Sequence, residues 1–142
     1  ISLMEQEKNH NIHSIATFQS FQENVERQKT DLIKLLQELK KSGKTVVGYG
    51  ASTKGNVILQ YCGISIDLLP CIGDITPFKD GAYTPGTKIP IVSMEKAKAM
   101  KPDYFLVLPW GFRNDILLRE KEGVLNQGSK MIFPLPFVEI VS

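Results

Sequence analysis

All 11 glycines and all 8 prolines of this 142-residue chain lie after Ser42. Because these two residue types interrupt regular structure most often, the first 42 residues can form a long helix, whereas the remainder must turn frequently. Apolar residues recur in the first part at helical spacings, namely at Phe18, Phe21, Val25, Leu32, Leu35, Leu36 and Leu39. This pattern predicts one amphipathic helix over residues 17–41, ended by Gly43.

Two uses of the long helix fit this pattern. Its apolar face can lie across the core of the chain's own body, or it can serve as a docking or dimerisation surface. The polar residues 1–16 precede most of it, and the chain starts at Ile1 instead of a methionine. We therefore expect residues 1–16 to be a connector from an upstream domain that this sequence lacks, and residues 17–142 to form the domain itself.

The bulk composition is that of an ordinary globular domain. Hydrophobic residues make up 42% and charged residues 23%, and the formal net charge is +2. These values exclude a disordered chain and give no reason to expect a nucleic-acid partner. No apolar run is long enough to cross a membrane and no signal peptide opens the chain, so we expect a cytoplasmic protein without membrane contact. Cys62 and Cys71 match no zinc-ligand spacing and are expected to be buried, reduced thiols.

After Gly43, strand patterns alternate with helix patterns. We expect strands at 44–49, 66–74, 89–92, 103–108 and 130–133, and helices at 53–61, 93–100 and 112–121. The helix over 53–61 should begin at a Ser52 or Thr53 cap and carry Val57, Ile58 and Tyr61 on one face. Strands that alternate with helices of about ten residues form parallel βαβ units. The fold class is therefore α/β, with a small Rossmann-like sheet of four to five mainly parallel strands and flanking helices over 44–142.

The most informative stretch lies between the first strand and the helix that follows it, and reads Gly48-Tyr49-Gly50-Ala51-Ser52-Thr53-Lys54-Gly55-Asn56. In this context, backbone N–H groups and the helix dipole favour an anion, and glycine lets a phosphate approach closely. The candidate binding residues here are Tyr49, Gly50, Lys54 and Asn56. The spacing departs from the dinucleotide fingerprint GxGxxG, because Thr53 stands at the third glycine, and no Walker A motif is present. The stretch can alternatively serve only to pack the helix tightly against the strand.

Further candidates follow later strands. Asp74 ends the second strand, where an acid either bonds ribose hydroxyls or caps the next loop. Lys79 lies in that loop, and Trp110 and Arg113 follow the strand over 103–108. Since open parallel sheets bind ligands beyond the carboxyl ends of their strands, these loops should converge at one edge. There Trp110 can stack on a base or sugar and Arg113 can meet an anion; the alternatives are a buried tryptophan and a solvated arginine.

The sequence shows no acid–base pair of its own. Its only histidines, His10 and His13, lie in the polar N-terminal stretch, and no histidine accompanies either cysteine. No GxSxG motif occurs. We therefore assign no catalytic residue, cofactor-binding residue or metal ligand to this chain.

An ordered series of motifs resembles the C-terminal domain of nucleotide-sugar C-methyltransferases. The resemblance runs from about Phe18 to Pro136, and Leu3-Met4-Glu5-Gln6-Glu7 is similar to the segment that leads into that domain. The resemblance therefore covers nearly the whole chain. The motifs are Gly48-Tyr49-Gly50-Ala51-x-x-Lys54-Gly55, Tyr61-Cys62-Gly63-Ile64, Asp74-x-x-Pro77-x-Lys79-x-Gly81, Pro85-Gly86-Thr87-x-Ile89-Pro90-Ile91, Pro102-Asp103-Tyr104, Leu108-Pro109-Trp110 and Pro134-x-Pro136. One position departs from the family pattern, because Gly111 follows Trp110 where the family commonly has asparagine.

The resemblance implies a domain of a larger enzyme. Members of this family are similar in having a cysteine-rich zinc module and an S-adenosylmethionine-binding domain before this one, and they methylate a carbon beside the keto group of a nucleotide-linked deoxysugar. By resemblance, the zinc, the S-adenosylmethionine and the catalytic base belong to those upstream parts, so this chain alone should bind neither and be inactive. Tyr49, Lys54, Lys79 and Trp110 are expected to line the cleft for a nucleotide-diphosphate sugar, which closes against the S-adenosylmethionine-binding domain of the same polypeptide.

The glycine-rich turn also fits a second function. A free-standing Rossmann-like module that binds a nucleotide or coenzyme A and acts in regulation would use the same turn. A CxxC…CxxC module and a methyltransferase motif upstream of Ile1 would decide for the enzyme. An initiator methionine just before Ile1 would decide for the module.

Overall fold

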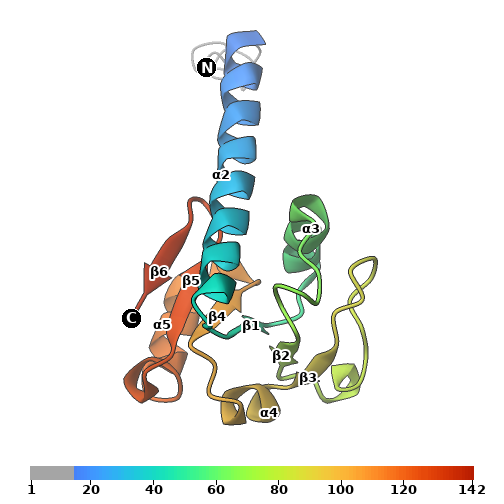
Figure 1. Cartoon of the computed structure of the whole chain (residues 1–142), viewed down its shortest axis with the longest axis vertical. Coiled ribbons are helices and arrows are strands. Elements are labelled where there is room, and N and C mark those ends of the chain that lie inside the picture. Colours follow the sequence, from blue (N-terminus) through green and yellow to red (C-terminus); the bar gives the residue numbers. More distant parts are fainter. Residues whose placement is uncertain (1–14) are drawn as a thin grey trace, which may run out of the picture.

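The structure is a computed structural model that describes residues 15–142. It shows a long helix standing on an α/β body (Figure 1). The helices and strands are, in chain order, α2 (Ile15–Lys41), β1 (Val46–Tyr49), α3 (Thr53–Cys62), β2 (Ile72–Asp74), β3 (Ile91–Ser93), α4 (Met94–Ala99), β4 (Tyr104–Val107), α5 (Arg113–Glu120), β5 (Lys130–Phe133) and β6 (Glu139–Val141). Short 3-10 turns occupy Pro77–Lys79, Trp110–Phe112 and Leu125–Gln127.

The strands form one sheet in the order β3-β2-β1-β4-β5-β6. The first five strands pair in parallel, and β6 pairs antiparallel with β5. The chain therefore winds outward from β1 in both directions, which is the Rossmann-like arrangement, with its switch point between β1 and β4. The α/β prediction is confirmed. The sheet has one strand more than the four to five expected, because the three-residue edge strand β6 carries no recognisable strand pattern.

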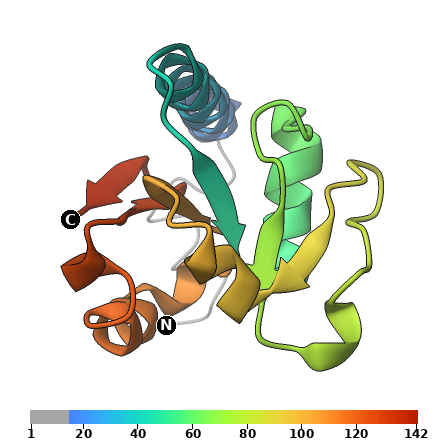
Figure 2. The same ribbon diagram turned by 60° about the horizontal axis from the view of Figure 1, so that its bottom comes forward.

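The two faces of the sheet are covered by different helices, with α2 and α3 on one side and α4 and α5 on the other (Figure 2). Successive strand residues alternate between two cores. Leu106 packs with residues of α2 and α3, whereas Phe105 and Val107 pack with residues of α4 and α5. This alternation follows from the two-residue period of a strand, and it decides which side chains reach which side of the sheet.

The long helix takes the first of the two roles that its pattern allowed, and docking or dimerisation stays a prediction. Its last turns lie across the body's core, where Leu32, Leu36 and Leu39 are buried. Its first turns project beyond the body and leave Ile15, Phe18 and Phe21 exposed (Figure 1). Gly43 adopts a left-handed φ of +73° and ends the helix as predicted. Of the predicted connector over 1–16, residues 1–14 lie outside the described residues, and the last two belong to α2.

Two local predictions were wrong. The second strand is restricted to Ile72–Asp74, because Leu68 and Leu69 donate backbone hydrogen bonds to the Ser65 carbonyl and form a turn before Pro70. The buried face of α3 consists of Gly55, Leu59 and Cys62 instead of the predicted face with Val57 and Tyr61, which are exposed. Because Gly55 has no apolar side chain, the buried face of α3 shows a weaker apolar pattern in the sequence than the face with Val57 and Tyr61.

Cys62 and Cys71 are buried free thiols, as predicted, and burial raises the pKa of both. Neither thiol is therefore an activated nucleophile. Within residues 15–142, no helix combines the length and the apolarity that crossing a membrane requires.

Candidate functional site

A small polar pocket of about 190 Å³ lies at the carboxyl ends of β1 and β2. Four of the predicted site residues line it, namely Tyr49, Gly50, Asp74 and Lys79. Pro109, which follows β4, and Arg119 from α5 complete the wall on the other side of the switch point. The pocket thus occupies the place where open parallel sheets bind their ligands.

The turn after β1 gives the pocket its backbone wall. Gly50 has a φ of +80°, and a Cβ at this position would lie 2.8 Å from Cδ of Pro109. Both the conformation and the close approach therefore require glycine. Ser52 then caps α3 by accepting a hydrogen bond from the Gly55 N–H at 3.0 Å. The first turn of α3 points its free N–H groups towards this edge of the sheet, as a helix N-terminus does at anion sites.

Asp74 joins the turn after β1 to the loop after β2. Its buried carboxylate accepts hydrogen bonds from the backbone N–H groups of Ala51 (2.7 Å) and Thr76 (2.8 Å), and Nζ of Lys79 lies 3.6 Å from Oδ2. Burial alone would raise the pKa of Asp74, but the hydrogen bonds from Thr76 and Ala51 and the charge of Lys79 outweigh it and lower the pKa. In this arrangement Asp74 makes the contacts of a loop cap. A bond to ribose remains a prediction.

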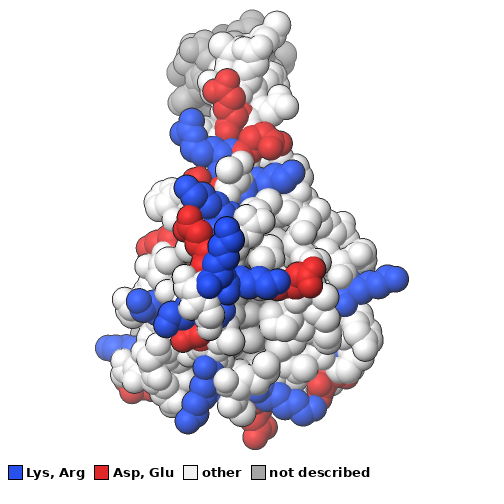
Figure 3. Space-filling view, viewed as in Figure 1, with Lys and Arg blue, Asp and Glu red and all other residues white. Residues whose placement is uncertain are grey.

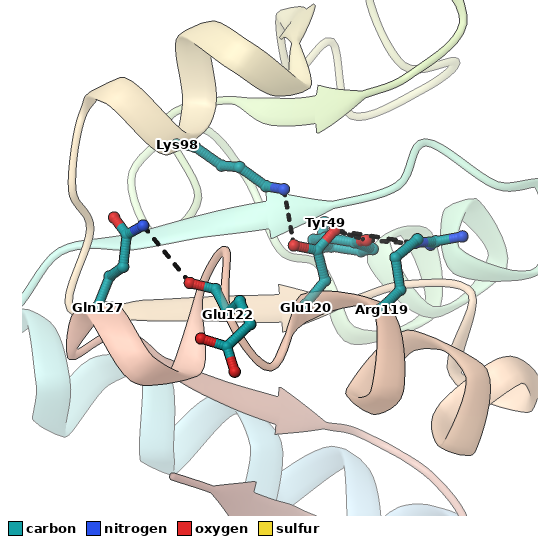
Figure 4. A network of polar contacts seen from close by, with 6 residues as sticks. All are labelled: Tyr49, Lys98, Arg119, Glu120, Glu122 and Gln127. Carbon is teal, nitrogen blue, oxygen red and sulfur yellow. Dashed lines mark hydrogen bonds and ion pairs between the residues drawn. The ribbon is translucent and has the colours of Figure 1, made fainter.

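A partly buried polar network, which was not predicted from the sequence, lies on the other side of the pocket; its residues are drawn in Figure 4. The hydroxyl of Tyr49 donates to Oε1 of Glu120 at 2.5 Å and accepts from a guanidinium nitrogen of Arg119 at 3.0 Å. Nζ of Lys98, from α4, lies 2.6 Å from Oε2 of Glu120. Burial, followed by the bond to Glu120, raises the pKa of Tyr49 to about 12, so its hydroxyl stays protonated at neutral pH.

The sequence carried a signal for this network. Glu120 follows Ile116 by four residues and therefore shares its helix face, which is buried in the core. A carboxylate at a core position of a helix needs partners, because an unpaired buried charge is costly. The partners come from β1, α4 and α5, which are far apart in sequence, so the pattern could flag Glu120 but not name Lys98 or Tyr49.

The other four predicted site residues lie elsewhere. Asn56 lines a neighbouring pocket of about 400 Å³ together with Lys79, and its buried Oδ1 has no hydrogen-bond partner among the described residues. Arg113 forms a two-pronged ion pair with Glu139, at 3.0 and 2.6 Å, which attaches α5 to the edge strand β6. Lys54 places Nζ 5.9 Å from the ring centre of Trp110.

Trp110 faces away from the polar pocket. It lines an apolar groove of about 710 Å³ between α2, α3 and the segment 134–136. Beside α2, the surface over α3 is largely free of charged side chains (Figure 3). The structure therefore divides the predicted site into a polar pocket on one side of the α3 N-terminus and an aromatic-lined groove on the other.

Comparison with known families matches residues 1–136 to the C-methyltransferase C-terminal domain. The chain belongs to this family. It is also 35% identical over 140 residues to the C-methyltransferase NovU of Streptomyces niveus, a match that includes 99% of this chain and 33% of NovU. The chain thus spans about a third of the length of this relative.

Two features of this C-methyltransferase C-terminal domain bear on its chemistry. Among residues 15–142, no group of three or more His, Cys, Asp or Glu side chains is placed to hold a metal ion, so zinc does not fit the part that the structure describes. Gly111 faces open space, because a Cβ there would meet no atom within 4 Å. The loop after Trp110 therefore has room for a larger side chain at this position.

Proposed function

We propose that this domain provides the substrate side of an S-adenosylmethionine-dependent C-methyltransferase and binds a nucleotide-diphosphate deoxysugar. The family and the name of the NovU relative support C-methyl transfer. In this proposal the S-adenosylmethionine-binding domain is another part of a longer polypeptide. The match to one third of NovU supports such an arrangement.

The observation that carries the proposal is the polar pocket at the switch point. Two cationic side chains, Lys79 and Arg119, line it beside the Ser52 hydroxyl and the N-terminus of α3. A diphosphate is a dense anion that accepts several hydrogen bonds, and this combination of donors suits it. The sugar would extend from there towards the domain that supplies the methyl group.

The chemistry assigned to the pocket is binding. Methylation beside a keto group needs a base that removes a proton from carbon, and S-adenosylmethionine then supplies the methyl group. Neither Asp74, which lines the pocket, nor Glu120, which lies behind it, is poised as that base. Asp74 accepts two backbone hydrogen bonds, and Glu120 is bonded to both Tyr49 and Lys98. The described residues offer no group of side chains that could hold zinc.

The four predicted residues that do not line the polar pocket can contact the ligand only outside it. Lys54 and Trp110 lie at the opposite side of the α3 N-terminus, where they can contact the nucleoside or sugar only if the ligand passes over that helix end. Asn56 lies in the neighbouring pocket, which shares Lys79 with the polar one. Arg113 is engaged with Glu139 and would have to exchange that partner for an anion.

Calorimetric titration of the chain with a thymidine diphosphate sugar tests the proposal. We expect saturable binding that Lys79→Gln weakens about tenfold, because the variant removes one charge-assisted hydrogen bond. Lys40→Gln is the matched control, since Lys40 is exposed in the last turn of α2, away from the pocket, and its removal should leave the affinity unchanged. No binding by the wild-type chain, or equal losses in the two variants, would contradict the proposal.

A further inference from the structure

Arg119 carries a positive charge that the protein only partly compensates. Its side chain lines the polar pocket and is 55% exposed. One terminal nitrogen donates to the neutral Tyr49 hydroxyl at 3.0 Å, and Nε lies 3.8 Å from Oε1 of Glu120. The other terminal nitrogen makes no hydrogen bond with any residue in the described range 15–142. Part of the guanidinium therefore faces the pocket with N–H groups that are available to a ligand.

Glu120 compensates the charge of Arg119 only in part, because its two oxygens already bind Lys98 and Tyr49 more closely. The carboxylate is buried, with 4% exposure, and it holds the ammonium of Lys98 at 2.6 Å and the hydroxyl of Tyr49 at 2.5 Å. Across the pocket, Asp74 is similarly occupied by backbone N–H groups. The pocket and the network behind it hold three cations, Lys79, Lys98 and Arg119, beside two carboxylates, and the charge of Asp115 in the first turn of α5 also acts on Arg119. What favours a bound anion is therefore the set of guanidinium N–H donors that remain directed at the pocket.

The network also fixes where the guanidinium points. Tyr49 is buried and makes an edge-to-face contact with Phe105 at 6.0 Å between ring centres. Because its hydroxyl proton is directed at Glu120, the lone pairs of the oxygen are directed at Arg119. A side chain held by a rigid acceptor loses less freedom when it binds a ligand than a free one.

We propose that Arg119 is an anion-binding residue of the polar pocket and that the Tyr49 hydroxyl is its positioning group. The ligand group is a phosphate, which accepts two parallel hydrogen bonds from a guanidinium. The identification of that phosphate with the diphosphate of a nucleotide sugar rests on the proposed function. The anion site itself rests on the geometry of Arg119, Tyr49 and Glu120.

The test measures the affinity of the chain for two probes, inorganic pyrophosphate and a thymidine diphosphate sugar, by calorimetry. Arg119→Gln should weaken both about tenfold, because it removes charge-assisted hydrogen bonds at a partly exposed site. Arg119→Lys keeps the charge but not the planar pair of N–H donors, so it should lose less affinity than Arg119→Gln. Arg27→Gln on the exposed surface of α2 is the matched control and should change neither affinity.

A double-mutant cycle tests whether the Tyr49 hydroxyl acts by positioning Arg119 or only stabilises the fold. Tyr49→Phe should weaken pyrophosphate binding about threefold in the wild-type background and not at all in the Arg119→Gln background, since the hydroxyl acts through Arg119. A merely structural role would give the same loss in both backgrounds and would overturn the positioning assignment. Circular dichroism of each variant checks that the fold is retained.

The two probes keep this inference distinct from the proposed function. If pyrophosphate binds through Arg119 but the sugar nucleotide does not bind, the anion site stands and the proposed function fails. If the sugar nucleotide binds and Arg119→Gln and Arg119→Lys bind it as tightly as the wild type, the proposed function stands and this inference is overturned. If the wild-type chain binds neither probe, both are overturned.

Discussion

Gly55, in the first turn of α3, packs closely against Leu108, the residue that follows β4. A Cβ at this position would lie 2.3 Å from Cβ of Leu108 and 3.1 Å from its Cα, and 3.0 Å from the Oγ of Ser52. Ordinary contact begins at 3.4 Å. The variant Gly55→Ala would therefore push the start of α3 away from the loop after β4, and would disturb the cap that Ser52 provides.

The expected cost follows from two opposing effects. Adding a methyl group to a closely packed site costs about 1–3 kcal/mol, and an approach of 2.3 Å to Cβ of Leu108 puts this site in the upper part of that range, about 2–3 kcal/mol. Alanine has the better helix propensity, by up to about 1 kcal/mol, and this offsets part of the cost. The net loss for Gly55→Ala should be about 1–2 kcal/mol, which for a domain of this size lowers the melting temperature by about 2–8 °C.

Urea unfolding followed by circular dichroism measures this loss, with Gly111→Ala as the matched control. Gly111 has ordinary backbone angles and no atom within 4 Å of an added Cβ, so its variant should stay within about 0.5 kcal/mol of the wild type. If Gly55→Ala is as stable as Gly111→Ala, the close packing of α3 on Leu108 is refuted.

Two further predictions concern Asp74 and the methyl donor. Asp74→Asn should destabilise the chain by about 1–3 kcal/mol at pH 7, because an amide cannot accept from Ala51 and Thr76 on both of its heavy atoms. Since the pKa of Asp74 is lowered on folding, its contribution is complete above the ordinary carboxyl pKa and is lost as pH falls below about 4. The gap in urea midpoint between variant and wild type should therefore narrow at pH 3.5, and a gap that is independent of pH would contradict this reasoning. Calorimetry should detect no tight binding of S-adenosylmethionine by this chain, and tight binding would refute the assignment of that ligand to another part of the polypeptide.

The architecture was predictable where one local signal decides one feature. The absence of glycine and proline before Gly43 predicted α2, and the left-handed Gly43 ends it. Ser52, one of the two residues predicted to cap α3, accepts the expected hydrogen bond from the third residue after it. The alternation of strands and helices predicted the parallel sheet, because it depends on hydrophobic period alone.

The site was only partly predictable, because its residues are brought together by tertiary contacts. Position along the chain placed Tyr49, Gly50, Asp74 and Lys79 at the right edge of the sheet. It could not show that Trp110 turns towards α2 and α3, since the direction is set by the short 3-10 turn after β4. Arg119 and Glu120 were missed because their partners are about 20 and 70 residues away in the sequence.

The central claim is that the polar pocket binds the diphosphate of a nucleotide sugar, and backbone NMR of the chain titrated with a thymidine diphosphate sugar tests it most directly. We expect the amide signals of Gly50, Ser52 and Thr76 to shift with one saturable affinity, while those of Val57 and Tyr61 beside the apolar groove stay unchanged. Shifts confined to the groove, or no shifts at saturating ligand, would contradict the account.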